Sequence, residues 1–141
     1  MFTRLDEVDD IAERVIACAI EVHKTMGTGL SEAIYKECLP LECRKQRLRL
    51  DYEQVVHVAY KGTPLLSTYK VDLIVEKCLV VELKAIEAIR PVHKAQVITY
   101  LKITGLPAGL LINFSEATLK AGLHRLDHPE RYARRRAAAG P

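Results

Sequence analysis

Apolar residues recur at intervals of three and four positions near the start of the chain, which is the spacing of one face of a helix. The residues of this face are Ile11, Val15, Cys18, Ala19, Val22 and Met26. Asp9 and Asp10 are good helix starters that precede the pattern, and Gly27 and Gly29 end it. The spacing therefore predicts an amphipathic first helix that packs one face against a core.

A second helical stretch is predicted over residues 31–47, and Pro40 lies inside it. Proline lacks the backbone donor that a helix interior needs, and its ring clashes with the preceding turn. We therefore expect Pro40 to kink or divide this second helix.

The apolar period changes to two beyond residue 50, which is the period of a strand. Val56, Val58 and Tyr60 alternate with more polar neighbours, and residues 61–64 have the composition of a turn. The other strand-like segments are residues 69–75 and 79–86. This part of the chain predicts a meander of three antiparallel strands.

The last predicted elements are a helix and a buried strand. Pro91 is suited to the first turn of a helix, and Gly105 is a natural stop for it. Residues 108–114 form an apolar run that the helical crossover would place parallel to a neighbouring strand. The predicted order is α, α, β, β, β, α, β, and the predicted class is α/β, with a mixed sheet flanked by helices.

The length and charge favour one domain with a basic tail. A chain of 141 residues can bury one hydrophobic core. We expect this domain over residues 1–127, because residues 128–141 are rich in Arg and Ala and have no core-facing pattern. The tail arginines, which outnumber the net charge of +3, are Arg131, Arg134, Arg135 and Arg136. This local charge permits a nucleic-acid partner without requiring one.

The cysteines and the N-terminal pattern favour a cytoplasmic protein with no membrane partner. The four cysteines lack the spacing of a zinc or iron-sulfur site, so we expect reduced thiols. Glu13 and Arg14 interrupt the N-terminal apolar residues, which leaves no continuous stretch for a signal peptide or a membrane span.

Residues 78–86 have the composition of a central strand, apolar on both faces except at Glu82 and Lys84. Because side chains alternate along a strand, Glu82 and Lys84 point to the same face. A buried charge is costly unless it is paired or holds a metal ion. The alternative is an ordinary ion pair on a solvated face of the sheet.

The preceding strand carries a second carboxylate, that of Asp72, which would lie close to Glu82. If the hairpin loop is centred on Lys77, Val75 lies opposite Leu79, and Asp72 lies opposite Glu82 with Cβ atoms about 5 Å apart. Facing carboxylates usually share a proton or bind a hard cation. A shift of the register by one residue would separate them.

Asp72 followed by Glu82-Leu83-Lys84 on the next strand resembles the signature of the PD-(D/E)XK nuclease superfamily, whose core has the order α, β, β, β, α, β. Residues 29–35, with the sequence Gly-Leu-Ser-Glu-Ala-Ile-Tyr, resemble the motif of its GxxExxY group. Residues 91–100 and 109–114 are also similar to that group. The resemblance covers roughly residues 9–126 and implies a restriction-endonuclease-like core. Val71 stands where the superfamily name has proline.

The resemblance implies roles for three further residues. Glu32 would supply an additional carboxylate, while Gln96 and Tyr100 resemble the QxxxY motif of RecB-like exonucleases, in which such residues position the DNA strand. Two alternatives stay open. Glu32 with Ser31 as cap also suits a helix N-terminus, and Gln96 with Tyr100 also suits the polar flank of a packing helix.

The residues of this motif suggest a chemistry. Asp72, Glu82 and the backbone carbonyl of Leu83 offer oxygen ligands suited to Mg²⁺ or Mn²⁺, and the resemblance implies Glu32 as a further ligand. Lys84 would orient the attacking water or bind the phosphate.

We therefore expect a metal-dependent nuclease that hydrolyses phosphodiester bonds of DNA. The alternatives are a catalytically silent nuclease-fold module that binds DNA or docks a protein, and an unrelated α/β protein with an ion-paired hairpin. The sequence leaves open DNA against RNA, the position of cleavage and the oligomeric state.

Overall fold

The computed structural model of the protein describes residues 5–131. The helices are α1 (Leu5–Met26), α2 (Glu32–Lys45) and α3 (Pro91–Thr104), and Lys120–Gly122 form a short 3₁₀ helix, η1. The strands are β1 (Leu50–Tyr60), β2 (Thr63–Val75), β3 (Leu79–Lys84), β4 (Ala108–Asn113) and β5 (Leu123–Asp127). The predicted order of elements is confirmed as far as β4.

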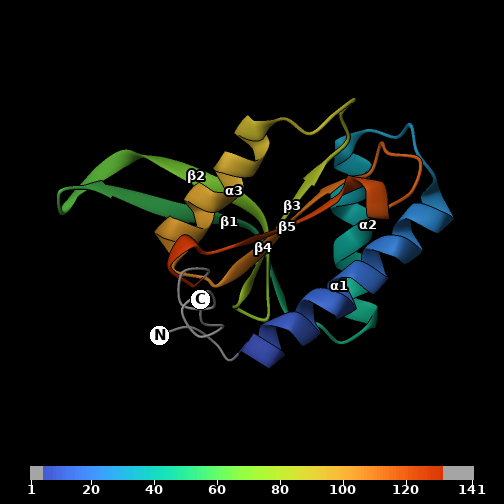
Figure 1. Ribbon diagram of the computed structural model, residues 1–141, viewed down its shortest axis with the longest axis horizontal. Coiled ribbons are helices and arrows are strands. Elements are labelled where there is room, and N and C mark those ends of the chain that lie inside the picture. Colours follow the sequence, from blue (N-terminus) through green and yellow to red (C-terminus); the bar gives the residue numbers. More distant parts are fainter. Residues whose placement is uncertain (1–4, 132–141) are drawn as a thin grey trace, which may run out of the picture.

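The strands form one mixed sheet of five strands in the order β1-β2-β3-β4-β5. β3 and β4 run parallel, and the other neighbouring strands run antiparallel. The predicted class, a meander plus a parallel strand flanked by helices, is therefore confirmed. β3 is the middle strand of the sheet, as its apolar composition predicts. Helices α1 and α2 lie together, and α3 lies apart from them (Figure 1).

Two apolar clusters cover the two faces of this sheet. On β3, Val81 and Leu83 belong to the cluster that contains the buried faces of α1 and α2. Val80, which points the other way, belongs to the cluster with Val97 and Leu101 of α3. The middle strand is thus enclosed on both faces, and a charged side chain on it needs a partner.

The boundaries of α3 follow from the residues that the sequence singles out. Pro91 is the first residue of α3, and Gly105 ends the helix in the left-handed conformation, with φ of 74°. Gly109 on β4 allows α3 to approach closely, because a Cβ atom there would lie 2.8 Å from Cγ1 of Val97.

Two predictions for the first helices need correction. Helix α1 begins at Leu5 rather than beside Asp9, and Val8 in this added turn is buried. Helix α2 continues through Pro40 as one helix, so Pro40 does not divide it, and the kink stays a prediction. Pro40 is buried, and burial of its apolar ring offsets part of the cost of the backbone hydrogen bond that proline cannot make.

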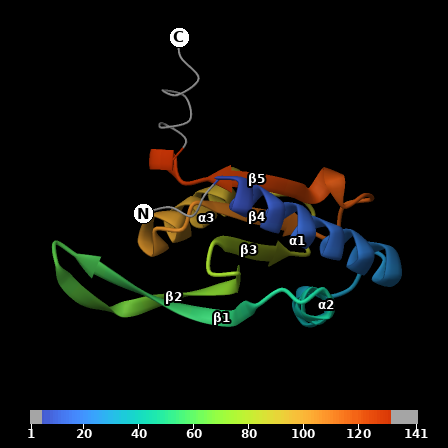
Figure 2. The same cartoon turned by 90° about the horizontal axis from the view of Figure 1, so that it is seen from below.

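The β1–β2 hairpin extends beyond the helices as an arm (Figure 2). β2 begins at Thr63, earlier than the predicted residue 69, and residues 63–70 are exposed. The alternating pattern that marks a half-buried strand is missing there because the side chains of residues 63–70 are exposed on both faces of the strand. Lys61 and Gly62 at its tip have φ of 48° and 81°, as a tight turn between twisted strands requires.

Strand β5 was not predicted. Its residues are half-buried or exposed and include the charged Arg125 and Asp127. This strand is held in place by antiparallel pairing with β4. In that pairing Leu123 lies opposite Ile112, and Asp127 lies opposite Ala108. A tertiary contact of this kind leaves a weak trace in the local sequence.

The predicted boundary between domain and tail at residues 127 and 128 stays a prediction. Residues 129–131 are helical, and Arg131 is buried. The tail arginines Arg134, Arg135 and Arg136 lie outside the described residues. Within residues 5–131, none of the helices has the length and apolar character needed to cross a membrane.

Candidate active site

The hairpin of β2 and β3 has the register that the sequence predicts. Val75 lies opposite Leu79, and two further pairs follow before the ladder ends. The next position in this register places Asp72 opposite Glu82. β3 continues beyond that point beside β4 as far as Lys84. From Glu82 onward, the backbone groups of β3 on the edge that faces β2 have no ladder partner and can bond side chains.

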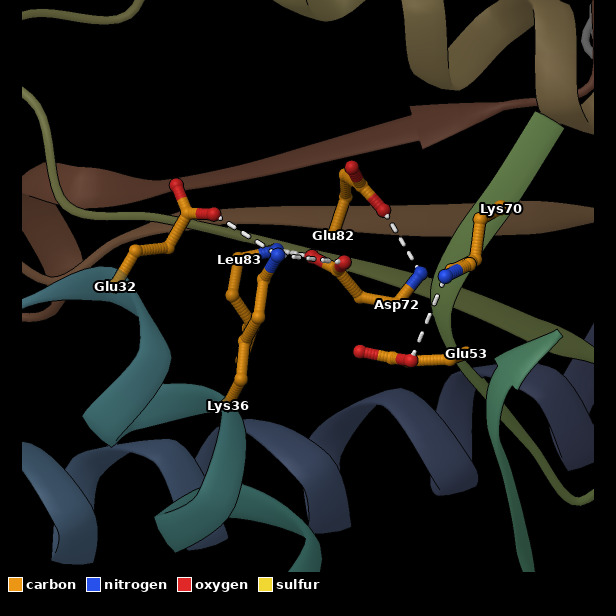
Figure 3. A network of polar contacts seen from close by, with 7 residues as sticks. All are labelled: Glu32, Lys36, Glu53, Lys70, Asp72, Glu82 and Leu83. Atoms are coloured by element: carbon orange, nitrogen blue, oxygen red, sulfur yellow. Dashed lines mark hydrogen bonds and ion pairs between the residues drawn. The ribbon is translucent and has the colours of Figure 1, made fainter.

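Side chains replace backbone pairing where β2 and β3 separate. The Asp72 N–H donates to Oε1 of Glu82 at 3.1 Å, and the Leu83 N–H donates to Oδ2 of Asp72 at 2.8 Å (Figure 3). Both acidic residues are buried, with Asp72 only 7% exposed and Glu82 only 5% exposed. Each carboxylate thus accepts a hydrogen bond from the opposite strand, which fixes the two acids relative to each other.

The surroundings of Glu82 disfavour its charged form. Burial and then the negative charge of Asp72 raise the pKa of Glu82 to about 7, although the Asp72 N–H and the charges of Lys84 and Lys36 oppose the shift. A carboxylate that resists ionisation in this way gains from a cation placed beside it.

Lys36 on α2 supplies a positive charge that the sequence analysis missed. Its Nζ atom lies 2.9 Å from Oε2 of Glu32 and 3.2 Å from Oδ1 of Asp72 (Figure 3). Burial alone lowers the pKa of Lys36, but its hydrogen bonds and charge interactions with Glu32 and Asp72 outweigh burial and raise it. The four-residue spacing of Glu32 and Lys36 is a helical ion-pair signal that could have drawn attention to this lysine.

Glu32 is the first residue of α2, and Lys36 connects it to Asp72. Ser31 occupies the N-cap position but makes no side-chain capping bond. The acidic residue still lies where the positive end of the helix dipole favours a negative charge. The structure therefore brings Glu32 near Asp72. It also leaves open the alternative that Glu32 stabilises the N-terminus of the helix.

The end of β3 presents one backbone group and one lysine at this site. The N–H and C=O groups of a strand residue point to the same edge, so the Leu83 carbonyl lies on the edge whose N–H bonds Asp72. Lys84, which is half-buried, is two residues beyond Glu82 and on the same face of β3. The side chains of Glu82 and Lys84 thus share the α3 side of the sheet.

Asn113 is a second residue that the sequence analysis missed. It lies opposite Lys84 on β4, and it is fully buried. Its Oδ1 atom accepts hydrogen bonds from the N–H groups of Ile86 at 3.1 Å and Ser115 at 3.3 Å, and its Nδ2 atom donates to the Ile86 carbonyl at 2.9 Å. Asn113 therefore fixes the chain that follows Lys84. A polar residue at the end of an apolar strand was the available signal.

The two predicted substrate-binding residues differ in their surroundings. Tyr100 on α3 is buried and contacts Tyr69 edge to face, with ring centroids 5.5 Å apart. Burial and then the charges of Glu82 and Asp72 raise the pKa of Tyr100 to about 12, so its hydroxyl belongs to the same electrostatic environment. Gln96, one turn earlier on α3, is half-buried.

The donor set fits a hard divalent cation. Asp72, Glu82 and the Leu83 carbonyl offer oxygen atoms, which Mg²⁺ and Mn²⁺ prefer. The ammonium group of Lys36 beside Asp72 and Glu32 shows that this cluster already attracts a positive charge. In residues 5–131, no three His, Cys, Asp or Glu side chains converge as a ready-made set of metal ligands.

A mixed sheet with a parallel central pair and with Asp72, Glu82 and Lys84 on adjoining strands defines a restriction-endonuclease-like protein. Residues 9–126 match the family model of the PD-(D/E)XK nuclease superfamily, and the chain belongs to this superfamily. The match extends from α1 into β5 and so includes every residue of the candidate site.

A solved structure described as "Crystal structure of SSO0001" is similar to this chain, with a TM-score of 0.54 and 15% sequence identity. The match covers 95% of this chain and 69% of the other. At this identity the similarity supports the fold and nothing finer. No curated protein sequence matches the chain.

Proposed function

We propose that this protein is a nuclease of the GxxExxY group, related to the RecB-like enzymes, that hydrolyses phosphodiester bonds of DNA with Mg²⁺ or Mn²⁺. The observation that carries the proposal is the buried pair of Asp72 and Glu82 beside Lys84, at the point where β2 and β3 separate. Membership of the superfamily supports the reaction class.

Each residue of the site has a proposed task. Asp72, Glu82 and the Leu83 carbonyl would hold the metal ion, with Glu32 as a further ligand. When bound, the ion lowers the pKa of a water molecule and offsets the charge of the transition state. Lys84 orients the attacking water or binds the scissile phosphate. The hydrogen bonds from Asp72 and Leu83 N–H groups keep the carboxylates in place before the ion arrives.

The substrate path runs past α3 and the β1–β2 arm. Gln96 and Tyr100 are proposed to position the strand beside the metal site. Residues 54–71 of the arm contain no Asp or Glu but include Lys61 and Lys70, and this charge favours phosphate contacts. The tail arginines would add contacts of the same unspecific kind.

The test is an assay of the purified protein on single-stranded, double-stranded and branched DNA and on RNA, with Mg²⁺, with Mn²⁺ or with EDTA. Cleavage of DNA that needs the divalent ion is expected. Cleavage of RNA alone would change the proposed substrate. Binding of DNA without cleavage under every condition would instead identify a catalytically silent nuclease-fold module.

A further inference from the structure

Lys36 occupies the position at which two proposed metal ligands approach each other. Its Nζ atom is 2.9 Å from Glu32 Oε2 and 3.2 Å from Asp72 Oδ1. Figure 3 shows its side chain reaching from α2 to the carboxylates, with Glu32 on one side and Asp72 on the other. The ammonium group is therefore the cation that this cluster holds in the structure.

Lys70, which is also close to Asp72, makes a different contact. Its Nζ atom lies 3.7 Å from Oε2 of Glu53, and its side chain is 61% exposed. Lys36 is only 26% exposed and contacts two acidic residues of the site. The two lysines thus carry the same charge near the same strand, but Lys36 is the one that binds the proposed ligands.

An ammonium group and a divalent ion cannot use the same carboxylate oxygens freely. Each carboxylate oxygen that accepts from Nζ has fewer lone pairs for a metal ion. A metal ion bound to these oxygens would also lie close to the ammonium group. The two positive charges would repel each other strongly because the site is partly shielded from water. Binding of the metal ion therefore requires the ammonium group to move away from Asp72.

The structure gives Lys36 a place to move. Its side chain also borders an open hollow on the surface between α2 and β1, whose other lining residues are Glu37, Pro40, Leu41, Arg44 and Tyr52. A lysine stem has four rotatable carbons, so the ammonium group can enter this hollow while the helix stays intact.

We propose that Lys36 is a tethered competitor of the divalent metal ion. Its ammonium group neutralises Glu32 and Asp72 in the metal-free protein, and the metal ion binds when this group leaves. The inference rests on the proposed metal site. It predicts that the wild-type protein binds its metal ion more weakly than the ligand set alone would allow, so that the metal concentration controls occupancy of the site.

The test is titration of Mn²⁺ into the full chain, without nucleic acid, followed by calorimetry. The proteins are the wild type, Lys36→Met, Lys36→Arg and Lys70→Met. Lys36→Met removes the competing charge and should bind Mn²⁺ about ten-fold more tightly, which corresponds to about 1.4 kcal/mol. Lys36→Arg keeps a cation on α2 and should stay close to the wild type. Lys70→Met removes an equal charge nearby and should tighten binding much less.

Two results would overturn the inference while leaving the metal site intact. One is equal or weaker Mn²⁺ binding by Lys36→Met when the wild type binds, and the other is equal tightening by Lys70→Met, which would indicate a general effect of charge. If neither the wild type nor Lys36→Met binds Mn²⁺, the proposed metal site is wrong and the inference fails with it. Binding by Lys36→Met alone would support strong competition.

Discussion

Asp72 and Glu82 are joined through the backbone N–H of Asp72, which donates to Oε1 of Glu82 at 3.1 Å. The contact occurs where the β2–β3 ladder ends. The Asp72 N–H has no backbone partner in that ladder, and the Glu82 carboxylate accepts its hydrogen bond instead. Two acids that repel each other through their charges are thereby held side by side. The same bond that shapes the hairpin also arranges the proposed metal ligands.

The first prediction concerns catalysis. Glu82→Gln keeps the size of the side chain and removes its charge, and Lys84→Ala removes the ammonium group. Each change should lower DNA cleavage by roughly two orders of magnitude or more, because metal binding or positioning of water is lost. Single-turnover cleavage with saturating Mg²⁺ measures the effect. Both variants should retain the circular dichroism spectrum of the wild type.

Glu13→Gln is the matched control for this measurement. Glu13 is an exposed glutamate on α1 and lies outside the carboxylate cluster. Its variant should cleave at the wild-type rate. Undiminished cleavage by Glu82→Gln would show that the reaction uses another site.

The second prediction concerns stability against pH in EDTA. The pKa of Glu82 is raised to about 7 in the folded protein from its ordinary value of 4.5. Between these two values the folded state binds more protons than the unfolded state, so the free energy of unfolding falls as the pH rises. The contribution of Glu82 is full below its unfolded pKa and is lost as the pH rises through about 7.

Glu82→Gln tests this sign, because glutamine cannot ionise and its carbonyl oxygen can still accept the Asp72 N–H. Urea unfolding of both proteins from pH 5 to pH 8 should show the variant gaining stability relative to the wild type as the pH rises. A constant difference across this range would mean that Glu82 does not titrate there.

The sequence predicted the register of the β2–β3 hairpin because two local signals agree. The apolar composition of residues 71–75 and 79–83 indicates two buried strands, and the short loop at Lys77 fixes which residues are opposite. The left-handed φ values of Glu76 and Lys77, 50° and 53°, show that this loop is tight. The proximity of Asp72 and Glu82 follows from that register alone.

The contact between Lys36 and Asp72 could not be derived in the same way. The spacing of Glu32 and Lys36 is visible in the sequence, but the angle at which α2 meets the sheet is set by packing of residues such as Tyr35 and Leu39, both fully buried. Strand β5 and the full length of the arm could not be predicted for the same reason. Both depend on pairing between strands rather than on a local sequence pattern.

The third prediction concerns Asn113. Asn113→Ala removes three partly buried hydrogen bonds to the backbone of Ile86 and Ser115. The free energy of unfolding should fall by about 1 to 3 kcal/mol, as expected for the loss of such bonds. Urea unfolding in EDTA measures it. Gln54→Ala is the control, since its amide makes one exposed bond to Val55, and its effect should be within about 0.5 kcal/mol.

A structural role confined to the fold and a role in positioning Lys84 can be separated. If Asn113 positions the end of β3, Asn113→Ala should also slow single-turnover cleavage under conditions in which the variant is fully folded. Loss of stability without a slower reaction would limit Asn113 to a structural role, and unchanged stability would contradict the importance of the three hydrogen bonds.

The last prediction concerns the basic tail. Arg134, Arg135 and Arg136 are proposed to bind phosphates, and each such contact releases condensed counterions when DNA binds. Changing all three to glutamine should weaken DNA binding most at low salt, and the slope of log affinity against log salt should fall by about 0.9 for each lost contact to duplex DNA. Fluorescence anisotropy with labelled duplex DNA in EDTA, which prevents cleavage, measures both quantities. Equal replacement of Arg44, Lys45 and Arg47, which lie at and just beyond the end of α2, controls for net charge. The same slope in the tail variant and the wild type would show that these arginines make no phosphate contacts.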